Sequence, residues 1–320
     1  FFPANNGREP LYIYLTTVAV AIWGQTTFAV RAAAALVGTL TTIPIYLLGK
    51  TWFGWRVGIL AAWVWAIPFW PVHLSRVGLR TILIVPVLAL TFWLATEAYR
   101  RQKTWLWGVA GLVYGLGFYT YLAFRFTPLL LLLVALYLVL TGGRERLWPG
   151  ALWFLAASLL VILPMAILIW QQPELFFGRS GQVSILHPDV YEDSVVKTLL
   201  GNSWAAIGMF LWRGDSILRH NPPGRPVFVP LLVVPFLIGL VLCLRHWRKP
   251  TAMAVLMWLM VMLGPTILAA DAPHFLRAAG VLPAAVLLPA IGLAWIWQWP
   301  RDQDWAPSWA GALLAGCLLA

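Results

Sequence analysis

Residues Leu147–Trp170 have the sequence LWPGALWFLAASLLVILPMAILIW, a stretch without a charged side chain. An α-helix needs about 20 apolar residues to cross the hydrocarbon core of a bilayer, where it satisfies its own backbone hydrogen bonds. Similar apolar runs recur along the 320 residues, of which 61% are hydrophobic and 10% charged, with a mean hydropathy of +0.81. The sequence therefore predicts an all-α, polytopic membrane protein.

About ten segments of the chain are predicted to cross the membrane as helices. They are Phe28–Leu48, Val57–Val72, Thr81–Tyr99, Trp105–Leu122, Phe126–Leu140, Leu147–Trp170, Val227–Leu244, Thr251–Ala270, Ala278–Trp297 and a last one from Trp305 onward. The first apolar stretch, Leu11–Trp23, is short for a span. We expect it to be an interfacial helix on the outer surface.

Basic residues divide the predicted loops into two sets. Alternation of the spans places one set on a single side: Lys50, Arg56, residues 100–103, 143–146 and 245–249, and Arg301. By the positive-inside rule this side is the cytoplasm. The extracytoplasmic side then carries further arginines, in residues 75–80, at Arg125 and in residues 271–280, together with a long hydrophilic loop, 171–226. Topology does not explain these arginines, so they indicate a bound anion.

The predicted organisation has four parts. Residues 1–27 form the end of an extracytoplasmic loop with the interfacial helix, 28–170 and 227–320 form transmembrane helices, and 171–226 form the long extracytoplasmic loop. Because the chain starts at Phe1 and stops inside an apolar run, we expect a fragment of a multi-pass plasma (inner) membrane protein. The net charge of +11 does not indicate nucleic-acid binding, since about half of the basic residues belong to the cytoplasmic loops.

Six stretches of sequence resemble a known family. NNGREPLYIYL (5–15), WGQTTFAVRAAAALVGTL (23–40) and FWPVHLSRVGLRTILIVPVL (69–88) resemble membrane glycosyltransferases of the protein mannosyltransferase and aminoarabinose transferase type, in the GT-C superfamily. GLGFYTYLAFRFTPLLLLL (115–133), GDSILRHNPPGRP (214–226) and APHFLRAAGVLPA (272–284) resemble its bacterial, dolichyl-phosphate-mannose-protein mannosyltransferase-like branch. The resemblance covers nearly the whole chain.

This resemblance implies an inverting sugar transferase at the extracytoplasmic face. Its donor would be a polyprenyl-phosphate sugar, and its acceptor a hydroxyl of a protein, lipid or cell-wall polymer. The family's catalytic Asp precedes the stretch matched by GREPLYIYL and falls outside this chain, so the catalytic base is unknown, with Glu9 and Asp215 as substitutes. No residue spacing indicates a metal site; a divalent cofactor remains undecided, because its acidic ligands could lie in that earlier loop.

A leaving phosphate requires positive charge, and arginine offers bidentate donors that stay protonated. The predicted phosphate-binding residues are Arg8, Arg76, Arg80, Arg125, His274 and Arg277. Arg76 and Arg80 are four residues apart, which would place both on one helix face. Asp271 is expected to cap a helix with Pro273 in its first turn, so that His274 and Arg277 lie near its positive end. Headgroup anchoring or ordinary helix capping are the structural alternatives.

Sugar and acceptor contacts are expected from a second group: Glu9, Tyr121, Asp215, Arg219, His220 and Asn221. Glu9 takes the place of a lysine that is usual in the aminoarabinose transferases, so we expect it to orient Arg8 or to touch the acceptor. Tyr121 could stack on a sugar ring. The other four belong to a proline-stiffened loop that suits sugar hydroxyls, and equally suits a cap that only closes the cavity.

Other classes of protein are compatible with many apolar spans. A transporter or lipid flippase would place polar residues near mid-membrane and show internal repeats, and a scaffold would not require arginines in three outer loops. A ligase with a pyrophosphate-linked donor would share the cavity but lack EPLYIYL. We therefore expect a lipid-linked sugar transferase.

Overall fold

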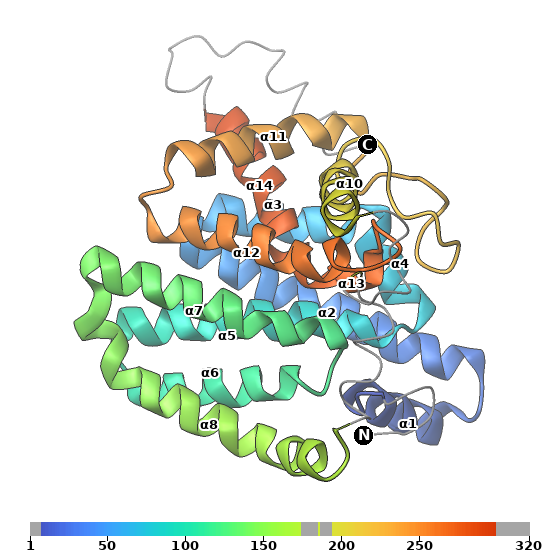
Figure 1. The fold of residues 1–320 in the computed structure, drawn as a ribbon, viewed down its shortest axis with the longest axis horizontal. Coiled ribbons are helices and arrows are strands. Elements are labelled where there is room, and N and C mark those ends of the chain that lie inside the picture. Colours follow the sequence, from blue (N-terminus) through green and yellow to red (C-terminus); the bar gives the residue numbers. More distant parts are fainter. Residues whose placement is uncertain (1–7, 174–184, 186–193, 299–320) are drawn as a thin grey trace.

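The computed structural model describes residues 8–173, 185 and 194–298, and these residues form a layered bundle of helices (Figure 1). The α-helices are α1 (Leu11–Trp23), α2 (Thr27–Phe53), α3 (Trp55–Ala66), α4 (Phe69–Val77), α5 (Ile84–Arg101), α6 (Thr104–Gly117), α7 (Thr127–Leu138), α8 (Arg144–Gln171), α10 (Val195–Gly208), α11 (Pro230–Arg245), α12 (Pro250–Ile267), α13 (Phe275–Ala278) and α14 (Leu282–Gln298). Short 3-10 helices are η1 (Arg80–Leu83), η2 (Leu122–Phe126) and η4 (Ala279–Val281), and a π-helical turn, η3 (Val139–Gly143), links α7 to α8.

Nine of the ten predicted spans coincide with helices of the described chain, and the tenth, from Trp305, lies outside the described residues. By length and hydropathy, five helical segments can cross a membrane, or six if α3 and α4, which meet at 58°, form one bent span. The all-α membrane fold is thus confirmed, while the number of ten crossings stays a prediction. Helix α10 was not predicted; it lies inside the stretch expected to be a hydrophilic loop.

The predicted interfacial helix has the bounds Leu11–Trp23 in the structure. Its start is fixed because Leu11 donates its backbone N–H to the carbonyl of Tyr119 at 3.1 Å, and the Tyr12 hydroxyl donates to the carbonyl of Val30 in α2 at 3.2 Å. Helix α1 therefore packs beside the first turns of α2 (Figure 1).

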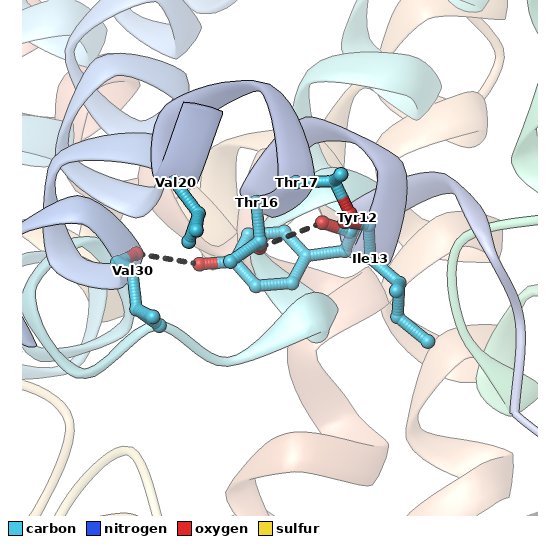
Figure 2. A pocket seen from close by; sticks show the side chains of 6 residues that line it. All are labelled: Tyr12, Ile13, Thr16, Thr17, Val20 and Val30. Atoms are coloured by element: carbon cyan, nitrogen blue, oxygen red, sulfur yellow. Dashed lines mark hydrogen bonds between the residues drawn. The ribbon is translucent and has the colours of Figure 1, made fainter. Parts of the chain in front are cut away.

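A shallow groove of about 340 Å³ lies along α1, lined by Tyr12, Ile13, Thr16, Thr17, Val20 and Val30 (Figure 2). Its two threonines donate their hydroxyls to carbonyls of their own helix, Thr16 to Tyr12 at 2.8 Å and Thr17 to Ile13 at 2.9 Å. This back-bonding satisfies the hydroxyls. The surface of the groove is therefore almost entirely apolar, although its lining includes hydroxyl-bearing side chains.

The predicted cytoplasmic loops meet at one end of the bundle. Gln102, between α5 and α6, donates to the carbonyl of Arg146 at 3.2 Å, and the Tyr137 hydroxyl donates to the carbonyl of Arg248 at 2.8 Å. The turns after α5, α7 and α11 thus share an end, while α4, α13 and the start of α1 lie toward the other (Figure 1). Within the described residues, these loops of the two predicted sets therefore lie toward different ends of the bundle.

Small residues allow the close packing of α11 against the buried helix α14. A Cβ at Gly239 would lie 1.9 Å from the carbonyl oxygen of Leu288, and one at Gly292 would lie 1.9 Å from that of Pro235. Each glycine therefore faces the backbone of the other helix, which is typical of helix contacts in membranes. Helix α14 is among the most buried helices of the described chain, since 12 of its residues, from Leu282 to Ala294, are buried.

Candidate functional site

Two buried polar clusters lie at the end of the bundle away from the basic loops. The first is built around Glu9, whose residue is only 3% exposed. Glu9 stands directly before Pro10 and α1, so the contacts that fix α1 against Tyr119 and Val30 also fix this carboxylate. A buried carboxylate of this kind requires a positive partner.

Arg80 supplies that partner. Its Nη1 lies 3.3 Å from Oε2 of Glu9, and both side chains are largely buried, at 13% and 4% exposure. The contact is an ion pair that falls outside hydrogen-bond geometry for these two atoms. Helix α4 ends at Gly78, whose φ of +78° is the left-handed conformation that glycine adopts readily, and η1 then begins at Arg80.

This break in the helix corrects the expectation that Arg76 and Arg80 share one helix face. Arg76 is exposed in the last turn of α4, whereas Arg80 begins a separate helix and points to Glu9. The structure does not bring Arg76 into the cluster. Arg8 is half-buried and directly precedes Glu9 in the sequence.

Helix η2 and the residue before it bring two further predicted residues to this ion pair. The guanidinium of Arg80 lies over the ring of Tyr121, with its Cζ 5.4 Å from the ring centroid. The charge of Glu9 also acts on Arg125, which is half-buried in η2. We name Glu9, Arg80, Tyr121 and Arg125 the Glu9 cluster. Two guanidinium groups and one carboxylate give it a net positive charge, which is the electrostatic requirement of an anion site.

The second cluster lies in the loop between α10 and α11. Asp215 accepts three hydrogen bonds: from the backbone N–H of Ile217 at 2.8 Å, from that of Phe275 at 2.8 Å, and from Nδ1 of His220 at 2.9 Å. Burial alone would raise the pKa of Asp215, but these bonds outweigh it and hold that pKa below its ordinary value. The carboxylate is therefore ionised at neutral pH.

His274 completes this cluster from the segment before α13. Its ring lies 4.6 Å from that of His220, measured between centroids, and its backbone N–H donates to Oγ1 of Thr266 at 2.7 Å. Burial and the nearby charge of Arg277 lower the pKa of His274 to about 3, so its imidazole is neutral. We name Asp215, His220 and His274 the Asp215 trio.

The structure contradicts two expectations about residues 271–277. Asp271 is exposed and does not cap a helix; the N-cap is His274, whose Nδ1 accepts the backbone N–H of Arg277 at 3.4 Å, and Pro273 precedes the helix. Because His274 is neutral, it does not add the positive charge expected of a phosphate-binding group. Arg277 keeps that charge, and α13 packs against η2, which carries Arg125.

The predicted sugar-binding loop turns most of its polar groups inward. The Asn221 amide donates to the carbonyls of Asp215 at 3.0 Å and of Arg225 at 2.7 Å. Asp215 and His220 bond to each other, and the exposed Arg219 accepts at its carbonyl from Nε2 of His73 at 2.9 Å. These contacts favour the alternative of a structured cap, with Arg219 as its outward-facing cation.

Sequence reasoning missed two residues that hold the cap in place. Thr266, in the last turn of α12, accepts a hydrogen bond from the backbone of His274, and His73 in α4 bonds to the carbonyl of Arg219. Thr266 lies in an apolar helix outside the six stretches that resemble the family, and His73 lies inside one of them, where only the arginines were singled out. The one sequence signal that could have identified Thr266 and His73 was the presence of a polar side chain in an otherwise apolar segment.

The helical bundle with arginines gathered at one end is the arrangement expected of the GT-C membrane glycosyltransferases, and a family comparison places the chain in this class. The chain belongs to the dolichyl-phosphate-mannose-protein mannosyltransferase family. The model of this family matches residues 7–170, about half of the chain. No curated protein matches the sequence.

Solved structures share the fold at low sequence identity. The oligosaccharyltransferase of Archaeoglobus fulgidus, tethered to an acceptor peptide, is 18% identical with a TM-score of 0.65, over 98% of this chain and 45% of that one. The same enzyme, AglB, with an inhibitory peptide and a dolichol-phosphate is 17% identical with a TM-score of 0.64, over 98% and 46%. ArnT of Cupriavidus metallidurans bound to undecaprenyl phosphate is 15% identical with a TM-score of 0.59, over 98% and 60%. The chain thus spans about half the length of these proteins.

Proposed function

We propose that this protein transfers a sugar from a polyprenyl-phosphate donor to an acceptor hydroxyl, with inversion, at the extracytoplasmic face of the plasma (inner) membrane. The observation that carries the proposal is the Glu9 cluster, in which the largely buried Arg80 pairs with the carboxylate of Glu9 and the half-buried Arg125 lies within reach of its charge. Family membership and the lipid phosphates bound in the structures of AglB and ArnT support it.

The charge of the cluster suits the departure of a lipid phosphate. The donor is a phosphodiester with one negative charge, and its leaving group gains a second as the bond to the sugar breaks. Contacts from Arg80 and Arg125 would therefore strengthen along the reaction, which is what lowers a barrier. In a largely buried site such contacts are stronger than in water.

Glu9 has a positioning role in this proposal. Its carboxylate is engaged by Arg80, so we assign it to holding the guanidinium groups in place. The acceptor hydroxyl needs a carboxylate or imidazole base within hydrogen-bond reach. Asp215 already accepts three hydrogen bonds inside the cap, so we do not assign it that role.

The direct test uses the purified full-length protein with a radiolabelled polyprenyl-phosphate hexose. We expect saturable binding and, with a suitable acceptor, release of polyprenyl phosphate. If folded protein binds no polyprenyl-phosphate sugar, the proposal fails, and a transporter or a ligase with a pyrophosphate-linked donor becomes the better explanation.

The proposed orientation makes a prediction about α1. In a background without Cys243 and Cys317, cysteines placed at Asn5 and Gln25 should both react with a membrane-impermeant thiol reagent in intact cells, because α1 lies along the outer surface. A cysteine at Gln102 should react only after the cells are opened. Labelling of Asn5 and Gln25 from opposite sides would show instead that α1 crosses the membrane.

A further inference from the structure

The Asp215 trio places three potential metal ligands together in the interior of the protein. Asp215 and His220 are each 1% exposed and His274 is 7% exposed. One ligand atom from each lies within 4.8 Å of the other two.

The surrounding contacts hold these side chains before any ion arrives. Backbone N–H groups of Ile217 and Phe275 bond the carboxylate, and Asn221 fixes the backbone on both sides of the loop. On the other side, Thr266 holds the backbone of His274. A ligand set that is fixed by independent hydrogen bonds loses little conformational entropy on binding.

We propose that Asp215, His220 and His274 form a three-ligand site for Zn²⁺ that joins the outer cap to the segment bearing Arg277. Two imidazoles and one carboxylate match the ligands of Zn²⁺, and three protein ligands leave a fourth position for water. Mg²⁺ and Ca²⁺ require mainly oxygen ligands, of which the trio offers one side chain. The site does not depend on the proposed transferase activity, and it joins residues whose spacing in the sequence indicated no metal site.

Nearby arginines set the strength of this site. Nη2 of Arg219 lies 3.4 Å from Nε2 of His220, and the charge of Arg277 acts on His274. Both charges repel a cation, so only an ion that forms strong bonds to nitrogen can compensate. Arg219 is exposed, and its side chain can move into solvent when the ion binds.

The test measures metal content in the intact, detergent-purified protein, isolated with a tag that lacks histidine and stripped with EDTA. After equilibration with ZnCl₂ and desalting, mass spectrometry of the metal should find about one Zn²⁺ per chain. His220→Gln and His274→Gln should lose it. His246→Gln, which changes an exposed histidine beside the basic loops, should retain it.

Two further measurements cover the case in which the ligand variants fail to fold. Co²⁺ bound to the wild type should give the intense visible bands of a four-coordinate site, and Arg219→Gln should bind Zn²⁺ about tenfold more tightly because a repelling charge is gone. Zn²⁺, but not Mg²⁺, should raise the thermal midpoint of the wild type. Folded protein that takes up no Zn²⁺, or equal loss in His246→Gln, would overturn the proposal.

Discussion

Replacing Arg80 by alanine is expected to reduce transfer by about 10²–10³-fold, the usual loss when one charge-stabilising donor is removed from a buried site. Arg80 is the residue of the Glu9 cluster that contacts both the carboxylate and the ring of Tyr121. Arg80→Lys should lose less, since it keeps the charge but not the bidentate geometry. The measurement is release of polyprenyl phosphate under single-turnover conditions.

A matched control separates the chemical role of Arg80 from a general effect of basic residues. Arg76→Ala removes an exposed arginine from the same segment and should keep most of the activity. Loss of Arg80 also leaves Glu9 buried without this partner, which itself costs stability. The double variant Arg80→Ala/Glu9→Gln should therefore regain stability but not transfer. Near wild-type transfer by folded Arg80→Ala would contradict the proposed role.

Replacing Asp215 by alanine is expected to destabilise the protein by about 3–5 kcal/mol, because it leaves buried donors without their charged acceptor. The affected donors are the N–H groups of Ile217 and Phe275 and Nδ1 of His220. Thermal unfolding in detergent without added metal, with limited proteolysis of residues 213–226, measures the effect.

The control for this variant is Asp271→Ala, which removes an exposed aspartate from the neighbouring segment. We expect it to change stability by less than about 0.5 kcal/mol, as is usual for exposed positions. Asp215→Asn should lie between the two, since an amide oxygen can still accept some of the bonds. Equal stability of the Asp215→Ala and Asp271→Ala variants would show that the hydrogen bonds of the Asp215 carboxylate do not stabilise the cap.

Much of the fold could be predicted because apolar runs and basic loops follow from the bilayer. Leu11–Trp23 has its predicted bounds, and the loops around Gln102, Arg146 and Arg248 share one end. The exceptions have local causes. Helix α4 ends at Val77 because its C-cap Gly78 adopts a left-handed backbone conformation that hydropathy does not report, and α10, with 14 residues, is too short to be recognised as a span.

The candidate site was predicted as a set of residue types rather than as an arrangement. Arginines on the predicted outer side were recognised by their charge, which could not show that Arg80 and not Arg76 contacts Glu9. Likewise, His220 and His274 come from distant segments whose contact depends on tertiary packing. Side-chain pairing across the chain was the missing information in both cases.

In the proposed site, the ion pair between Glu9 and Arg80 would also determine how strongly small anions bind. Without the carboxylate, buried guanidinium groups would attract chloride, sulfate and inorganic phosphate through charge alone. Because Glu9 already offsets part of that charge, electrostatic attraction contributes less to the binding of an anion. Tight binding then requires a further favourable contact. A hydrophobic tail buried in the bilayer provides such energy and a soluble ion does not, so the same carboxylate that orients Arg80 would protect the site from competition by the salts around it.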